Sequence, residues 1–136
     1  MPCLRPVWLL ATLWCAACGP KTVFTDTDVP KLEQLEDVMW AQAQSADPQF
    51  KKIGAASYTD GDFAAFGATA ARIQLTTAKL KAAPFSKGPA FNALAEKLAG
   101  HADELAQAAG AKDAARSSSA LQAMKDTCKS CHKQFK

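Results

Sequence analysis

The sequence has few of the features that mark β-strands, nucleic-acid binding or membrane crossing. No window alternates between apolar and polar residues at period two, the pattern of a half-buried strand. Glycine and proline number only seven each, so few positions interrupt a helix. A net charge of +3 is too small for the clustered Lys and Arg contacts that a polyanion needs. We therefore expect neither a β fold nor a nucleic-acid partner.

Alanine, by contrast, is abundant. It accounts for 29 of the 136 residues, and it has the lowest cost of any residue in a helix interior. The chain is 49% hydrophobic and 21% charged, which is an ordinary globular composition, and its length suits one domain. These features predict a single all-α domain.

The N-terminus has the pattern of an export signal. One positive charge at Arg5 precedes an apolar run from Val7 to Ala17. The run is shorter than the roughly 20 apolar residues that a spanning helix needs. We predict a signal peptide over residues 1–17 that is removed on export to the bacterial periplasm.

Ala16-Ala17-Cys18 resembles a bacterial lipobox, although Cys15 stands where that motif usually has Leu. Acylation of Cys18 would make the mature protein a lipoprotein held at the periplasmic face of a membrane. The alternative is ordinary cleavage after Ala17, which leaves a free thiol. Residues 18–30 show no apolar periodicity and predict a lipidated N-terminus and tether.

Four later stretches have apolar side chains at steps of three and four, the spacing of one helix face. The first runs from 31 to about 46, and Asp47-Pro48 predicts a stop followed by a short helix with Phe50 and Ile53. The other helices are expected at about 60–83, 89–110 and 114–136. Short connections predict an up-down-up-down antiparallel four-helix bundle over residues 31–136.

Cys128-Lys129-Ser130-Cys131-His132 is a C-x-x-C-H sequence, the attachment signature of c-type haem. Residues three and four apart share a helix face, so both thiols can reach the haem vinyl groups while the imidazole reaches the iron. A thioredoxin-like dithiol would need a βαβ context, and zinc would need four ligands, yet outside the motif only His101 remains. We predict one covalent haem c, with a redox or metal-binding dithiol as the alternative.

A four-helix chain of this size with one C-x-x-C-H near its C-terminus resembles the class II cytochromes c, the cytochrome c′ family, over residues 31–136. The resemblance implies thioether bonds from Cys128 and Cys131 and His132 as the proximal ligand. It also implies a bundle of four antiparallel helices. No catalytic side chain is required, because the iron does the chemistry, so we do not expect an enzyme.

The resemblance places a residue of the first helix on the distal side of the haem, at about Met39. In low-spin members a Met there completes six-coordination, and the protein transfers electrons. In high-spin members an apolar side chain leaves the iron five-coordinate and open to NO and CO. We expect a single-electron carrier with Met39 as ligand; the alternative is that Met39 only packs. Met124 and His101 are less favoured ligands.

Two positions near the haem depart from the family or vary within it. Leu35 stands where the family often has Arg, whereas Lys136, four residues after His132, can supply a cation near the haem. The last helix also has a lysine flank that fits either a docking rim for an acidic redox partner or a solvated face favoured by the helix dipole: Lys125, Lys129, Lys133 and Lys136. Dimerisation, common in the family, stays open.

Overall fold

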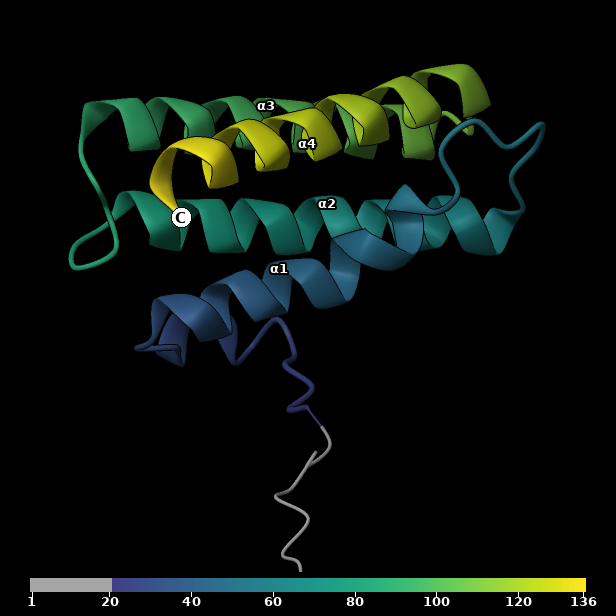
Figure 1. Ribbon diagram of the computed structural model, residues 1–136. Helices are drawn as coiled ribbons and strands as arrows, with labels where there is room; N and C mark the ends of the chain where they lie inside the picture. The colour runs from purple at the N-terminus through teal and green to yellow at the C-terminus, as the bar shows by residue number, and fades with distance from the viewer. Residues whose placement is uncertain (1–20) are drawn as a thin grey trace, which may run out of the picture.

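The computed structural model describes residues 21–136. Within this range the chain is helical and has no strand. It forms a short 3₁₀ helix, η1 (Val29–Lys31), and four α-helices: α1 (Leu35–Phe50), α2 (Asp60–Lys81), α3 (Pro89–Gly110) and α4 (Ala114–Phe135). Successive helices run in alternating directions, with α2 between α1 and the α3–α4 pair (Figure 1). The predicted all-α four-helix bundle is confirmed. The expected signal peptide (1–17) and lipid anchor (Cys18) lie outside the described residues.

Side chains define where the later helices begin. Thr59 and Asp62 form a capping box at α2: the Thr59 hydroxyl accepts from the Asp62 amide at 3.1 Å, and the Asp62 carboxylate accepts from the Thr59 amide at 2.9 Å. The Asp113 carboxylate caps α4 by accepting from the Arg116 amide at 3.0 Å. Gly88, with φ of +103°, precedes α3 in a conformation that favours glycine.

The first helix is longer at its C-terminal end than expected. It continues through Asp47-Pro48 to Phe50, so the predicted stop near 46 and the separate short helix are wrong. Pro48 lies in the last turn of α1, where its missing N–H removes one backbone hydrogen bond. No further helical turn follows it, so a kink caused by its ring disturbs nothing downstream in the helix. The same dipeptide that can start a helix is therefore compatible with the end of one.

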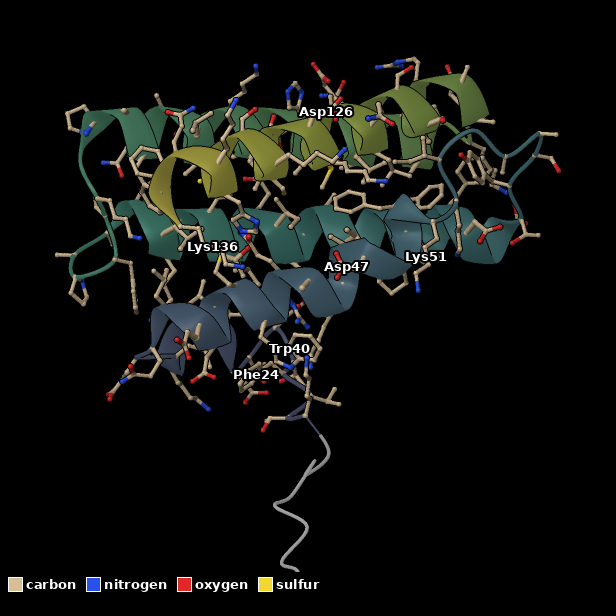
Figure 2. The ribbon with its side chains drawn as sticks, viewed as in Figure 1. Phe24, Trp40, Asp47, Lys51, Asp126 and Lys136 are labelled. Atoms are coloured by element: carbon tan, nitrogen blue, oxygen red, sulfur yellow. The ribbon has the colours of Figure 1, made fainter. Side chains whose placement is uncertain are left out.

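Residues 21–32, part of the segment expected to be a tether, pack against α1 and α2. Val29 and Leu32 are buried, and Trp40 Nε1 donates to a backbone carbonyl of this segment at 2.7 Å. Phe24 and Trp40 lie together on the side of α1 that faces away from α4 (Figure 2). This segment therefore covers the outer side of α1.

The core consists of two apolar clusters. The larger joins the C-terminal end of α1 to α2, α3 and α4, and its fully buried side chains include Phe66, Leu105 and Leu121. The smaller lies around Val38 and Phe91 and joins η1, α1 and the two ends of the α2–α3 connection. The clusters lie along the bundle axis, and the candidate functional site lies between them.

The interface between α1 and α2 contains buried polar side chains. Gln42 Nε2 donates to Thr76 Oγ1 at 2.9 Å, and Ser45 Oγ donates to Thr69 Oγ1 at 3.0 Å. Neighbouring helices of the bundle pack in the pairs α1–α2, α2–α3, α3–α4 and α1–α4. Of these four interfaces, the one between α1 and α4 is the least closely packed. None of the described helices is both long and apolar enough to cross a membrane.

Candidate functional site

A cleft opens between α1 and α4, where these two helices make few contacts. Its outer cavity has a volume of about 460 Å³, within the usual range for ligand pockets of about 300–1,000 Å³. A smaller cavity of about 100 Å³ continues toward the core, and Met39, Phe91 and Cys131 line both. The cleft therefore runs from the surface to the gap between the two apolar clusters.

The apolar stripe of α1 faces this cleft. Leu35, Met39 and Ala43 follow one another at steps of four, line the outer cavity and are only partly buried. The fully buried face of α1 instead carries Val38 and Ala41. Apolar surface left against water is unfavourable, so a stripe of this kind favours an apolar ligand that covers it.

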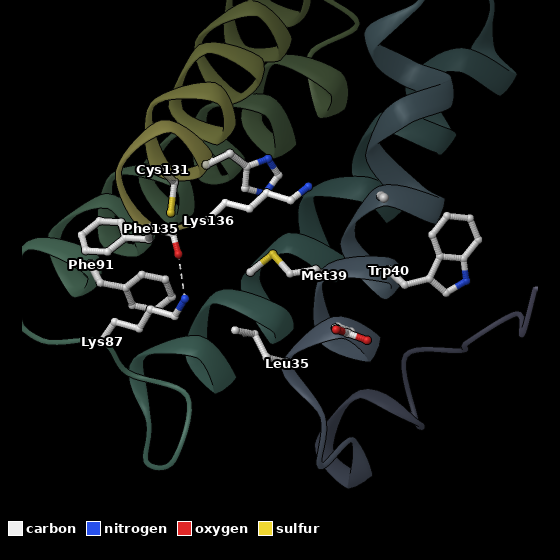
Figure 3. A pocket seen from close by; sticks show the side chains of 11 residues that line it. Leu35, Met39, Trp40, Lys87, Phe91, Cys131, Phe135 and Lys136 are labelled. Carbon is white, nitrogen blue, oxygen red and sulfur yellow. Dashed lines mark hydrogen bonds between the residues drawn. The ribbon is translucent and has the colours of Figure 1, made fainter.

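The C-x-x-C-H residues face the same cleft from α4. Cys128, Cys131 and His132 all line the inner cavity, and the exposed His132 also lines the outer one. Figure 3 shows the Cys131 and Met39 side chains pointing into the space between α4 and α1. The helical spacing thus places two thiols and an imidazole on one wall and a thioether on the other.

The thiols are in a poor environment for thiolate chemistry. Burial raises the pKa of Cys128 to about 11, and the charges of Cys131 and Asp47 add to the effect. Burial also raises the pKa of Cys131, an effect that Lys87 partly offsets. Redox-active dithiols have lowered pKa values and sit near helix N-termini, whereas this pair lies near a helix C-terminus. The environment does not favour the dithiol alternative.

Other candidate ligands lie away from the cleft. Met124 is fully buried within the larger apolar cluster. His101 lines a separate groove between α3 and α4, and its Nδ1 lies 3.4 Å from a Glu104 carboxylate oxygen. Residues 21–136 hold no group of three or more His, Cys, Asp or Glu that fits a metal ion. Of the expected sulfur and imidazole ligands, the structure places only Met39 and His132 across the cleft from each other.

Two lysines reach the outer cavity. Lys136 is one of them, whereas Lys129 is exposed outside the cavity, 3.9 Å from an Asp126 oxygen. Lys87, which the sequence analysis missed, also lines the cavity from the connection between α2 and α3. No local pattern distinguishes it, because only the folded chain brings this connection next to the end of α4.

Aromatic rings close the end of the cleft beside Lys87. Phe91 and Phe135 pack edge to face, with ring centroids 5.3 Å apart. Phe91 is buried and Phe135 partly buried, so together they join the start of α3 to the end of α4. This contact gives the cavity an apolar wall next to Cys131.

An antiparallel four-helix bundle whose last helix presents C-x-x-C-H to a cleft has the construction of a c-type cytochrome. The sequence profile of the family described as Cytochrome C′ matches residues 30–136, so the chain belongs to the cytochrome c′ family. The cytochrome c′ of Pararhodospirillum photometricum is 47% identical over 73 residues, which cover 54% of this chain and 57% of that relative. The match thus spans little more than half of the relative's length. No solved structure gives a significant match.

Proteins of this family carry a covalently attached c-type haem, and the prediction of haem c is confirmed on that basis. The described residues fit such a group, because the cleft combines an apolar lining with two thiols and an imidazole. The family's members are exported periplasmic proteins, in agreement with the expected export. They are electron carriers or gas-binding haem proteins.

Proposed function

We propose that this protein binds a small gaseous ligand such as NO or CO at a haem held in the cleft between α1 and α4. Cys128 and Cys131 hold the haem as thioethers, and His132 binds one side of the iron. Met39 packs on the other side without binding. Family membership and the cytochrome c′ relative support this choice over a six-coordinate iron.

One observation carries the proposal: Met39 lines both the outer and the inner cavity. Met39 therefore borders the space that the haem would fill, on the wall opposite His132. When bound, the haem iron supplies the ligand-binding and redox chemistry. The chain's part is to cover the haem with Leu35, Phe91 and neighbouring apolar groups and to control access through Met39.

A second function follows if the Met39 sulfur binds the iron. The protein would then be a single-electron carrier, because a thioether ligand raises the potential and keeps small ligands out. The direction of the Met39 side chain into the cleft favours this alternative (Figure 3). The two functions differ only in what Met39 does, so one set of variants distinguishes them.

The test uses the full chain matured with haem in a bacterial periplasm. Absorption spectra are recorded for the oxidised protein, the reduced protein and the reduced protein under CO. We expect a high-spin spectrum that shifts fully with CO and keeps its spin state in Met39→Leu. The matched control is Met124→Leu, which makes the same substitution away from the cleft.

Three results would contradict parts of this proposal. A low-spin spectrum with a weak far-red thioether-to-iron band, insensitive to CO and lost in Met39→Leu, would establish the electron carrier instead. A polypeptide that keeps haem in denaturing electrophoresis when Cys128 and Cys131 are both replaced by Ala would overturn the assigned attachment. No haem on the wild-type chain would overturn both haem functions.

We also propose that Cys18, outside the described residues, is acylated and holds the mature protein at a periplasmic membrane face. Its support is the sequence Ala16-Ala17-Cys18 alone. Cys18→Ala should move the protein from the membrane to the soluble periplasmic fraction. Recovery of the variant in the membrane fraction would contradict the anchor.

We also propose an acidic redox partner for the lysines of α4. Lys129, Lys133 and Lys136 are exposed, and Lys136 reaches the mouth of the cleft. Complementary charge mainly raises association rates and makes them depend on salt. Electron transfer from an acidic donor protein should therefore slow in Lys133→Gln at low salt. An unchanged rate would remove this surface from consideration.

A further inference from the structure

The outer cavity is apolar inside and charged at its rim. The charged side chains that line it are two cations, Lys87 and Lys136, and one anion, Glu36, besides His132. Haem has a matching character: an apolar ring bears two carboxylates on the edge opposite the two vinyl positions that thiols bind. Leu35 offers no charge to these carboxylates, so any cation that pairs with them comes from elsewhere in the fold.

Lys87 is positioned for this role by a contact with α4. Its Nζ donates to the backbone oxygen of Phe135, in the last turn of α4, at 2.8 Å (Figure 3). An ammonium has three donors, so two remain for other acceptors. Lys87 forms no ion pair with a carboxylate among residues 21–136.

We propose that Lys87, which lies in the connection between α2 and α3, binds a haem carboxylate. One donor holds the end of α4 through Phe135, and a second makes a charge-assisted hydrogen bond to the carboxylate. Lys136 provides the neighbouring cation from the end of the chain. This assignment rests on the proposed position of the haem, but it does not depend on whether Met39 binds the iron.

A purely structural role for Lys87 is the competing explanation. A cation near a helix C-terminus satisfies the last carbonyls and interacts favourably with the helix dipole. Such a role would leave the haem carboxylates unaffected. A readout at the carboxylate therefore distinguishes the two roles.

The first experiment titrates the haem carboxylates of the matured full chain by NMR of the haem side chains. Loss of a nearby cation disfavours the ionised carboxylate, so Lys87→Gln should raise one carboxylate pKa by about one unit, whereas Lys87→Arg should not. Lys97→Gln is the control, because Lys97 is exposed on α3 and lines the separate groove. The other charged groups that line the cavity, Glu36 and Lys136, are the same in every variant, so their effect on the carboxylates is common to all of them.

A second measurement avoids reliance on one titration. The full chain with Cys128→Ala and Cys131→Ala is mixed with haem or with haem dimethyl ester, in which both carboxylates are converted to neutral esters. We expect tighter binding of haem than of the ester, and a several-fold smaller preference when Lys87→Gln is added. If this background does not bind haem, the carboxylate titration alone decides.

Failure of the Lys87 assignment and failure of the proposed function would give different results. If Lys87→Gln speeds amide exchange at the end of α4 while the carboxylate pKa values stay unchanged, Lys87 only caps the helix and the inference is overturned. If the wild-type chain carries no haem, the proposed function fails first, and Lys87 is not the cause. A raised carboxylate pKa in Lys87→Gln alone supports the assignment.

Discussion

Cys128 and Cys131 lie one turn apart on α4, yet Cys128 packs against the larger apolar cluster and Cys131 against the smaller one. The inner cavity lies between them and reaches both clusters. A group bound to both sulfurs would therefore join two halves of the core that the polypeptide leaves separate. This arrangement makes the haem part of the packing as well as the site of the chemistry.

The first prediction concerns the chain without haem. Because α1 contacts α4 little and turns its apolar stripe to the cleft, it should open more readily than α3 in the haem-free protein. Hydrogen exchange should show α1 amides exchanging at least about tenfold faster than α3 amides, a difference of about 1.4 kcal/mol. Haem attachment should reduce this difference. Equal protection of α1 and α3 without haem would contradict the prediction.

The second prediction separates two methionines by their surroundings. Met124 is fully buried in the larger cluster, so Met124→Ala should lower the free energy of unfolding by about 2–5 kcal/mol. Met39 borders open volume, and Met39→Ala should cost the haem-free chain less than about 1 kcal/mol because few packing contacts are lost. Urea unfolding followed by circular dichroism measures both.

The haem spectrum should respond to the same two methionines in the opposite way. Met39→Ala should change access of CO to the iron, whereas Met124→Ala should leave the spectrum unchanged. A large stability loss in Met39→Ala together with an unaltered spectrum would place Met39 in the core and outside the site.

Most of the helices could be predicted from apolar spacing and caps, because those signals are local. The end of α1 could not, since Asp47-Pro48 fits either a new helix or a last turn. Apolar spacing predicted the stripe of Leu35 and Met39, whereas only the family resemblance predicted that a haem lies against it. Apolar spacing shows that a face needs covering and does not say whether protein or cofactor covers it.

The part of the candidate site that belongs to the C-x-x-C-H motif could be predicted from the sequence. Cys128, Cys131 and His132 share a helix face by spacing alone, and the fold then places Met39 opposite. Lys87 was missed because it lies far from the motif in sequence, and its position depends on how α3 packs against α4. The sequence around a single loop residue does not show which distant part of the chain that residue will contact.

The third prediction uses the buried bond between α1 and α2. Thr76 Oγ1 also donates to backbone oxygens of its own helix, so it keeps a partner when Gln42 is replaced. Gln42 would lose its partner in Thr76→Val while remaining only 8% exposed. Leaving a buried donor unpaired costs about 1–3 kcal/mol, so Thr76→Val should destabilise the protein more than Gln42→Leu.

The double variant provides the check on that asymmetry. When both Gln42→Leu and Thr76→Val are present, no buried amide is left unpaired, and the stability should return close to that of Gln42→Leu alone. Urea midpoints at one pH measure all four proteins. Simple addition of the two single losses would contradict the proposed pairing.

The fourth prediction concerns acid stability at the start of α2. The Lys52 ammonium, 2.6 Å from Asp62 Oδ1, and hydrogen bonds from Thr59 lower the pKa of Asp62 from 3.8 to about 2. A carboxyl whose pKa is lower in the folded state stabilises the fold at pH values above 3.8, and this contribution is lost as the pH falls toward 2. The wild-type advantage over Asp62→Asn should therefore shrink between pH 4 and pH 2.

Asp62→Asn suits this comparison because its amide oxygen can still accept from the Thr59 amide, so the variant loses the charge and keeps the capping acceptor. Lys52→Gln removes the other member of the pair and should reduce the same pH-dependent difference. Urea midpoints at steps of half a pH unit measure it. A difference between wild type and Asp62→Asn that stays constant down to pH 2 would show that the Asp62 charge does not stabilise the fold. The start of α2 would then depend on the neutral hydrogen bonds of its capping box.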